Sequence, residues 1–262
     1  MVYNQTMEVI NGQWIMDGVD SGDPGCVHTS DELLEVIERV GFMPLFSNSI
    51  PGFSVENMTD PVNWWCGDET SDPWEWRIIL ARTGKVAYGK FFEGKAGFVS
   101  KKWFPHFANY RRDGYDFDAR YEDGKARHKE KLVMGLFEPD GVEPRDINKS
   151  TLSKYGCHEA LYTNEMKEMA GFGKDGFKGF EGVLTKLQMQ TYLITRDFKP
   201  RINKHGEEFG WPVAIMTPPE YLWGYKFVTG QYKEMPGDSL KKITGQISKF
   251  YDVTDRDIRK VL

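Results

Sequence analysis

The order of predicted elements between residues 125 and 216 constrains the fold most. The hydrophobic periodicity predicts, in order, helices at 125–137, 164–170 and 177–186, and then strands at 188–198 and 211–216. The turn between the two strands is long and basic, and it contains Asn203-Lys204-His205-Gly206-Glu207. Three helices followed by two strands around such a turn is the order of a winged helix, in which the third helix enters the major groove of DNA.

Further elements flank this segment on both sides. In residues 1–124, Thr29 followed by Glu32 predicts the start of one helix, Asp72-Pro73 predicts the start of another, and residues 85–100 read as a hairpin. The sequence pattern of residues 217–262 predicts helices. We therefore expect an α+β fold: a winged helix at 125–216, with an N-terminal α/β region at 1–124 and a C-terminal helical region at 217–262.

The charge is unevenly distributed. The chain carries a net charge of −5, yet residues 1–76 hold fourteen acidic residues and one basic residue, Arg39, so the rest carries +8. Such a division is compatible with binding of a polyanion on one side only, although an accidental segregation of surface charge is an equal alternative. Residues 170–205 have a net charge of +4, and their basic residues are Lys174, Lys178, Lys186, Arg196, Lys199, Arg201 and Lys204. We expect these seven side chains to contact DNA.

Two glutamines open the predicted strand that follows the third helix. Side chains alternate faces along a strand, so Gln188 and Gln190 would point the same way. Two amides on one face can hold a water molecule, but neither can act as a base at neutral pH. The pair therefore suits a reaction with a good leaving group. An exposed polar strand face explains the same spacing.

Residues 103–120 interleave aromatic rings with arginines and aspartates. Asp116 and Asp118 have a spacing that acid–base or metal chemistry can use, but nearby arginines would neutralise them in a structural cluster of ion pairs. Phosphate or base contacts are the alternative, and for these the candidates are Tyr110, Arg111 and Arg112. Four tryptophans within residues 64–76 are explained by core packing or by stacking on nucleobases.

Composition argues against disulfide-bonded, metal-binding and membrane-spanning proteins. The three cysteines, Cys26, Cys66 and Cys157, have no Cys-x-x-Cys spacing, so we expect neither disulfides nor a metal site. No run of about 18 apolar residues predicts a membrane span, and residues 1–14 do not resemble a signal peptide. We expect a cytoplasmic monomer that requires no cofactor.

The motif Gln188-Met189-Gln190, after a third helix, resembles the catalytic motif of the winged-helix DNA glycosylases of the AlkZ and YcaQ type. A group of AlkZ-related bacterial proteins is more closely similar, on five runs: 72–77 (DPWEWR), 88–92 (YGKFF), 107–116 (FANYRRDGYD), 187–192 (LQMQTY) and 221–225 (YLWGY). The similarity covers most of residues 30–230. The AlkZ and YcaQ enzymes are longer and have tandem winged helices with an additional β-domain, whereas this sequence has room for one wing and a partial second unit.

The resemblance implies hydrolysis of the N-glycosidic bond of an alkylated purine in double-stranded DNA. Alkylation makes the base a good leaving group, so an amide pair at Gln188 and Gln190 that orients water would suffice, without metal or cofactor. Two other classes remain open. One is a non-catalytic winged-helix protein that binds DNA, and the other is a protein-interaction or small-molecule role for the aromatic N-terminal region.

Overall fold

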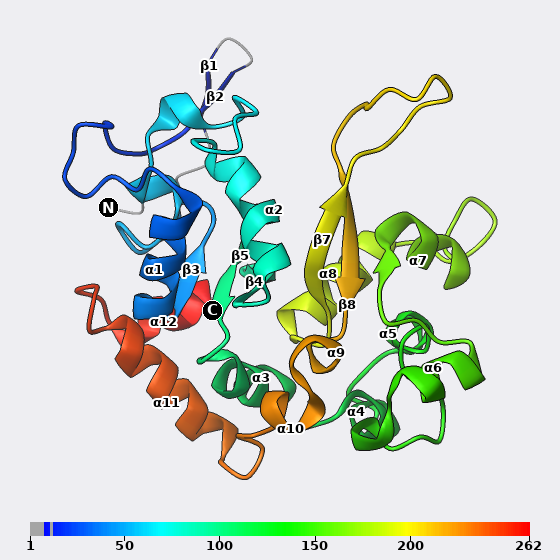
Figure 1. Cartoon of the computed structure of the whole chain (residues 1–262). Coiled ribbons are helices and arrows are strands. Elements are labelled where there is room, and N and C mark those ends of the chain that lie inside the picture. The colour runs from blue at the N-terminus through cyan, green and yellow to red at the C-terminus, as the bar shows by residue number, and fades with distance from the viewer. Residues whose placement is uncertain (1–7, 11–12) are drawn as a thin grey trace. The chain divides into compact units, whose positions relative to one another are not determined.

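The computed structural model describes residues 8–10 and 13–262, which form two compact units (Figure 1). Unit 1 combines the chain up to Phe104 with Leu240–Leu262, and unit 2 is Pro105–Ser239. The α+β character expected from the sequence is present in the elements of both units. The domain boundaries predicted after residues 124 and 216 stay a prediction.

Unit 1 contains a short antiparallel sheet and the helices that contact it. Its elements are β1 (Glu8–Ile10), β2 (Gln13–Ile15), α1 (Ser30–Val40), β3 (Phe42–Pro44), η1 (Glu56–Met58), η2 (Pro61–Asn63), α2 (Pro73–Thr83), β4 (Val86–Phe92), β5 (Lys95–Ser100), most of α11 (Pro236–Ile247) and α12 (Asp255–Val261). Strand β5 lies between β3 and β4 and pairs antiparallel with both. The predicted hairpin at 85–100 is therefore confirmed.

The two predicted helix starts in unit 1 are also confirmed. The hydroxyl of Thr29 accepts the backbone N–H of Glu32 at the start of α1, and a carboxylate oxygen of Asp72 accepts that of Trp74 at the start of α2. Each helix ends at a glycine with positive φ, Gly41 after α1 and Gly84 after α2. Local capping chemistry is sufficient to set both ends of these helices.

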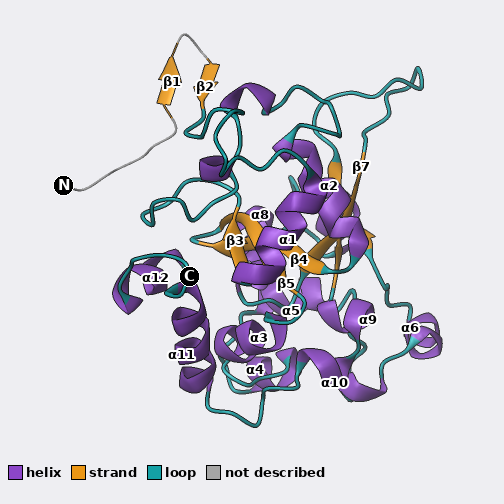
Figure 2. Ribbon diagram, turned by 60° about the vertical axis from the view of Figure 1, so that its left-hand side comes forward, coloured by secondary structure: helices purple, strands orange, loops and turns teal. Residues whose placement is uncertain are grey.

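Many of the acidic residues of unit 1 hold loops together. Figure 2 shows how much of the chain before α2 is loop. The buried Glu56 accepts the backbone N–H groups of Asp17 and Ser47, and Asp72 accepts those of Trp65 and Gly67 besides its cap. Further carboxylates accept loop N–H groups in the same way, at Asp20, Asp23, Glu32, Asp60 and Asp68. Backbone groups without a ladder need such partners, so much of the negative charge has a structural use.

Unit 2 is mainly helical and also contains antiparallel strands. Its elements are α3 (Phe104–Arg112), which begins at the unit boundary, α4 (Phe117–Glu122), α5 (His128–Met134), η3 (Pro144–Asp146), α6 (Lys149–Tyr155), β6 (Leu161–Tyr162), α7 (Thr163–Met169), α8 (Phe180–Met189), β7 (Ile194–Lys199), β8 (Val213–Thr217), α9 (Pro219–Trp223) and α10 (Tyr225–Val228). Strand β8 lies between β7 and β6 and is antiparallel to both. The core of unit 2 includes Phe117, Val133, Phe137, Leu187, Leu193 and Met216.

The boundary between α8 and β7 differs from the one predicted between the third helix and the first wing strand. The sequence predicted a helix at 177–186 and a strand from Gln188, but α8 runs to Met189 and β7 begins at Ile194. The helix starts late because Gly179, with a φ of 86°, occupies its N-cap. It continues through Gln188 because Leu184, Leu187 and Gln188 complete the buried face of the helix. The strand assignment for residues 188–193 was therefore wrong.

Candidate DNA-binding and catalytic site

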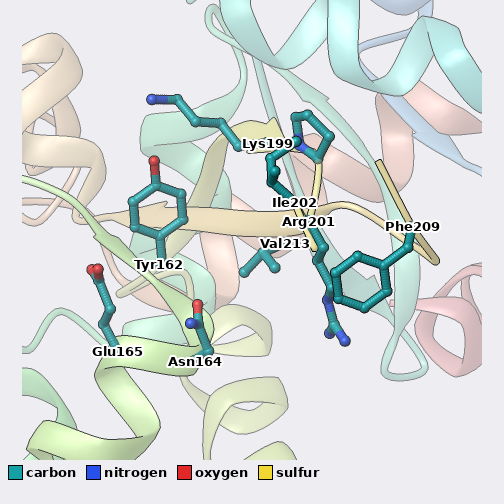
Figure 3. Close-up of a pocket in the computed structure, with 9 residues that line it drawn as sticks. Tyr162, Asn164, Glu165, Lys199, Arg201, Ile202, Phe209 and Val213 are labelled. Atoms are coloured by element: carbon teal, nitrogen blue, oxygen red, sulfur yellow. The ribbon is translucent and has the colours of Figure 1, made fainter. Parts of the chain in front are cut away.

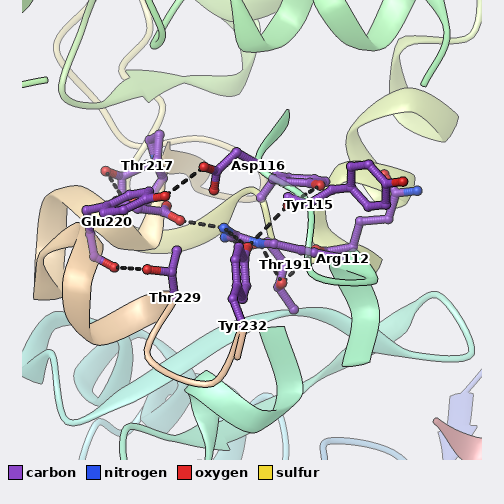
Figure 4. Close-up of polar contacts among 12 residues, drawn as sticks. Arg112, Tyr115, Asp116, Thr191, Thr217, Glu220, Thr229 and Tyr232 are labelled. Atoms are coloured by element: carbon purple, nitrogen blue, oxygen red, sulfur yellow. Dashed lines mark hydrogen bonds and ion pairs between the residues drawn. The ribbon is translucent and has the colours of Figure 1, made fainter. Parts of the chain in front are cut away.

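A buried arginine on α3 organises the polar interior of unit 2 (Figure 4). Arg112 donates from Nε to the hydroxyl oxygen of Thr191 (3.2 Å) and from Nη2 to its carbonyl oxygen (2.7 Å). Its Nη1 donates to Glu220 (2.5 Å) and to the Tyr232 hydroxyl oxygen (3.2 Å). Burial alone would lower the pKa of Arg112, but Glu220 beside it raises that pKa well above its ordinary value. Arg112 is therefore a permanent internal cation.

Three of the sequence runs that carry the family resemblance meet around this arginine. Arg112 lies in the run at 107–116, and Thr191 lies in the run at 187–192. Glu220 immediately precedes the run at 221–225, and within that run the Tyr225 hydroxyl donates to Asp116 (2.7 Å). These contacts join segments that are 79 to 109 residues apart. The runs therefore specify one buried polar assembly.

Two carboxyl groups near Arg112 hold their protons more tightly than usual. Burial, reinforced by the neighbouring Glu220, raises the pKa of Glu138 to about 8, and one oxygen of Glu138 is shielded from solvent with no hydrogen-bond partner among the described residues. Burial also raises the pKa of Asp116, although the hydrogen bond from Tyr225 opposes this. A carboxyl group that is protonated near neutral pH can donate a proton or a hydrogen bond. Neither shift was foreseen from the sequence.

The two glutamines do not form the predicted pair on one strand face. Gln188 lies on α8 and is buried, and its amide donates to the carbonyl oxygen of Leu184 (3.3 Å). Gln190 caps the end of the helix, and its amide oxygen is shielded from solvent without a hydrogen-bond partner among residues 8–10 and 13–262. Residues two apart on a helix point to different sides. The argument from strand alternation therefore fails, and Gln190 is the glutamine with an unsatisfied acceptor.

Thr191, which follows Gln190, has an unusual backbone conformation. Its φ is 64°, a region that β-branched residues rarely adopt. The Thr191 side chain is fully buried, and both its hydroxyl and its carbonyl oxygen accept hydrogen bonds from Arg112. The Arg112 contacts therefore help to hold Thr191, which follows the cap of α8 and turns the chain toward β7.

The seven predicted DNA-binding cations differ in how strongly they interact with other groups of the protein. Lys186 pairs with the buried Glu130 (2.7 Å), Arg196 pairs with Glu159 (3.1 Å), and Lys178 donates to the carbonyl oxygens of Gly173 and Lys174. The other four side chains are exposed, and they are Lys174, Lys199, Arg201 and Lys204. Of these, Lys199 also lies 5.7 Å from the Tyr162 ring. The hairpin of β7 and β8, residues 194–217, which is the predicted wing, thus presents the more accessible positive charge.

The candidates on α3 lie largely inside the protein. Arg112 is 1 % exposed, and its guanidinium is committed to the contacts described above, which corrects its expected role in contacting DNA. Arg111 packs against the rings of Phe107 and Tyr110, and burial lowers its pKa to about 10. Tyr110 is half-buried. Arg111 and Tyr110 stay candidates for DNA contacts.

The expected ion pairs of the two aspartates also need correction. Asp118 pairs with Lys131 (2.6 Å) rather than with an arginine, and the hydrogen bond to Asp116 comes from the Tyr225 hydroxyl.

The four clustered tryptophans of unit 1 differ in burial. Trp64 and Trp76 are buried, whereas Trp65 and Trp74 are half-buried. Core packing therefore accounts for Trp64 and Trp76, and stacking on nucleobases stays a prediction for Trp65 and Trp74.

A pocket of about 630 Å³ lies at the base of the wing (Figure 3). Tyr162 on β6 and Asn164 and Glu165 on α7 line one side, and Lys199, Arg201 and Phe209 line the wing side. Tyr162, Asn164 and Glu165 were not among the predicted site residues. The sequence contains one signal for them, their position directly before and within the predicted second helix, because that helix borders the wing in a winged helix.

The fold and this site define a mixed α/β protein with a basic hairpin next to a helical segment. Among the described residues, no helix has both the length and the apolar character to cross a membrane. The sequence matches the family model described as AlkZ related over residues 27–262, so the chain belongs to the AlkZ-related family. No curated protein and no solved structure matches the chain.

Proposed function

We propose that the chain is a winged-helix DNA repair protein that acts as a DNA glycosylase on alkylated purines. The observation that carries the proposal is the arrangement of unit 2, in which β6 precedes α7 and α8, and β7 and β8 follow them in the sheet order β7, β8, β6. A helix pair next to three antiparallel strands that include a long hairpin is typical of winged helices. Membership of the AlkZ-related family supports the repair function.

In this proposal the wing and α8 form the DNA-binding surface. Arg201 and Lys204 are exposed on the wing, and Lys174 is exposed in the turn before α8. Lysine and arginine side chains of this kind bind phosphates and release counterions, which makes the affinity depend on salt. Lys178, Lys186, Arg196 and Lys199 have partners within the protein and would contribute less.

The proposed chemistry centres on Gln190. An alkylated purine carries positive charge, so the glycosidic bond breaks once water is oriented at the sugar carbon and the developing oxocarbenium ion is stabilised. An amide oxygen without a partner, shielded from bulk solvent, gains most from a new hydrogen bond. Gln190 would accept such a bond from water or from the substrate. Gln188, whose amide donates within α8, would position this segment.

A non-catalytic winged-helix DNA-binding protein is the second candidate. The observation that favours it is the burial of Gln188, because a buried amide that donates to Leu184 cannot help to hold a water molecule on a shared face. Both candidates require DNA binding, and they differ only in base release.

Single-turnover release of 7-methylguanine from duplex DNA tests the catalytic proposal. We expect Gln190→Ala to slow release by about 10²-fold or more, the scale for losing a preorganised polar group, with little change in duplex affinity. Gln231→Ala, at a half-buried turn position outside the site, is the matched control. Wild-type protein that binds alkylated duplex but frees no N3- or N7-alkylated base would support the non-catalytic candidate.

A further inference from the structure

The pocket at the base of the wing combines three kinds of recognition group. Figure 3 shows the Asn164 amide and the Glu165 carboxylate extending from α7, while Lys199 is the last residue of β7 and Arg201 lies in the hairpin loop after it. The rings of Tyr162 and Phe209 also line the pocket, and Phe209 is 50 % exposed. All these residues belong to unit 2, so the pocket lies within one compact body. Its volume of about 630 Å³ falls within the range of small-ligand sites, roughly 300–1,000 Å³.

The charges of the pocket restrict what it can hold. The cations Lys199 and Arg201 favour an anion, but the carboxylate of Glu165 repels an anion that fills the whole pocket. A simple phosphate therefore leaves the carboxylate without a partner. A matching ligand has N–H donors at one end and a negative charge at the other, with a flat ring between them for the aromatic side chains.

We propose that this pocket binds one unpaired guanine nucleotide. Guanine presents N1–H and N2–H groups on one edge, and a carboxylate such as that of Glu165 can accept both. The Asn164 amide can bond to the remaining polar edge, and Phe209 or Tyr162 can stack on the ring. Arg201, whose guanidinium lies beside Phe209 in Figure 3, then neutralises the phosphate. Adenine lacks these donors, and the pyrimidines have a smaller stacking surface.

The wing hairpin is preformed for this role. The Asn203 side chain accepts the backbone N–H groups of His205 and Glu207 and donates to the Glu207 carboxylate (3.0 Å), which closes the tip of the hairpin. Ile202 pairs with Glu208 as an isolated bridge, and Phe209 N–H donates to the Arg201 carbonyl oxygen (3.0 Å). These contacts fix Arg201 and Phe209 on the same stretch of hairpin. The binding site therefore requires little ordering when the ligand binds.

Calorimetric titration of the full chain with mononucleotides tests the inference. We expect dGMP to bind more tightly than dIMP, which lacks the N2 amine, by about fivefold or more, and more tightly than deoxyguanosine, which lacks the phosphate. Glu165→Gln should abolish the difference between dGMP and dIMP, and Phe209→Ala should weaken the binding of both. Glu168→Gln, an exposed position on the same helix that does not line the pocket, should change neither.

Several outcomes would overturn the inference. They are equal affinity for dGMP, dIMP, dAMP and dCMP, an unchanged preference in Glu165→Gln, and no binding of dGMP at millimolar concentration. The readout is independent of the proposed glycosylase function, because it uses neither duplex DNA nor base release. A protein that binds dGMP but not duplex DNA would refute the proposed function alone, and the reverse result would refute the pocket assignment alone.

Discussion

Arg112 and Thr191, 79 residues apart in the sequence, are joined by two hydrogen bonds, one to the Thr191 hydroxyl oxygen (3.2 Å) and one to its carbonyl oxygen (2.7 Å). The contacts connect α3 with the end of α8. The chain at this end contains Gln188 and Gln190, so the conformation of the candidate catalytic segment depends on a side chain from a distant part of unit 2.

Replacement of Arg112 by methionine should destabilise the protein by about 3–5 kcal/mol. The substitution leaves the carboxylate of Glu220, which is 14 % exposed, without its cation, and removes both donors from Thr191. Urea unfolding measures the change in free energy. Arg145→Met is the matched control, since its pair with Glu143 is exposed at both ends and should contribute little to stability. Equal effects of the two substitutions would contradict the assigned role of Arg112.

Substitutions at Thr191 separate backbone conformation from hydrogen bonding. Asparagine tolerates a φ of 64° better than threonine and retains an acceptor for Arg112, so Thr191→Asn should be neutral or stabilising. Thr191→Val keeps the β-branched shape but removes the acceptor, and we expect a loss of about 1–3 kcal/mol. Thermal unfolding compares the two variants. A valine variant as stable as the asparagine variant would exclude a role for the hydroxyl.

The raised pKa of Glu138 predicts a pH dependence of stability. The folded pKa of about 8 lies above the unfolded value of 4.5, so between these pH values the native state binds a proton that the unfolded state has released. This contribution is complete below about pH 4.5 and is lost as the pH rises toward 8. The free energy of unfolding should fall by up to about 1.4 kcal/mol per pH unit from this group.

Glu138→Gln removes the titrating group and should flatten this part of the stability profile. Denaturant unfolding at several pH values between 5 and 8.5 provides the measurement. Glu143→Gln, at an exposed position, controls for the change of net charge and should leave the slope unchanged. Parallel profiles for wild type and Glu138→Gln would show that Glu138 is ionised in the folded protein.

Local signals predicted the helices α1 and α2 and the β4–β5 hairpin, because capping residues and turns act within a few positions of the chain. The predicted end of α8 was wrong. Residues 188–194 are of types typical of strands, whereas burial of Leu187 and Gln188 against the core favours the helix. Tertiary packing decided this boundary, and the sequence pattern does not contain that information.

The candidate site was predictable only in part. The basic residues of the wing were visible as a charge cluster, but the burial of Arg112 was not, since a pair of adjacent arginines usually indicates a surface. The partners of Arg112 come from positions 191, 220 and 232, and no local pattern connects them. The raised pKa of Glu138 depends on the same long-range burial.

The salt dependence of DNA binding should distinguish accessible cations from those engaged within the protein. Combined replacement of Arg201 and Lys204 by alanine should weaken duplex affinity and reduce the slope of log K against log salt by roughly one per lost phosphate contact. Both side chains are exposed on the wing, so we expect no loss of stability.

Lys186→Met should show the opposite pattern. Lys186 pairs with Glu130, which is 2 % exposed, so its removal leaves a buried carboxylate without its cation and should lower the unfolding free energy by about 3 kcal/mol. The salt slope of the folded variant should change little. Fluorescence anisotropy at several salt concentrations, together with melting temperatures, compares the two variants. If the wing variant kept the full slope while Lys186→Met lost one unit, α8 rather than the wing would be the principal contact with DNA.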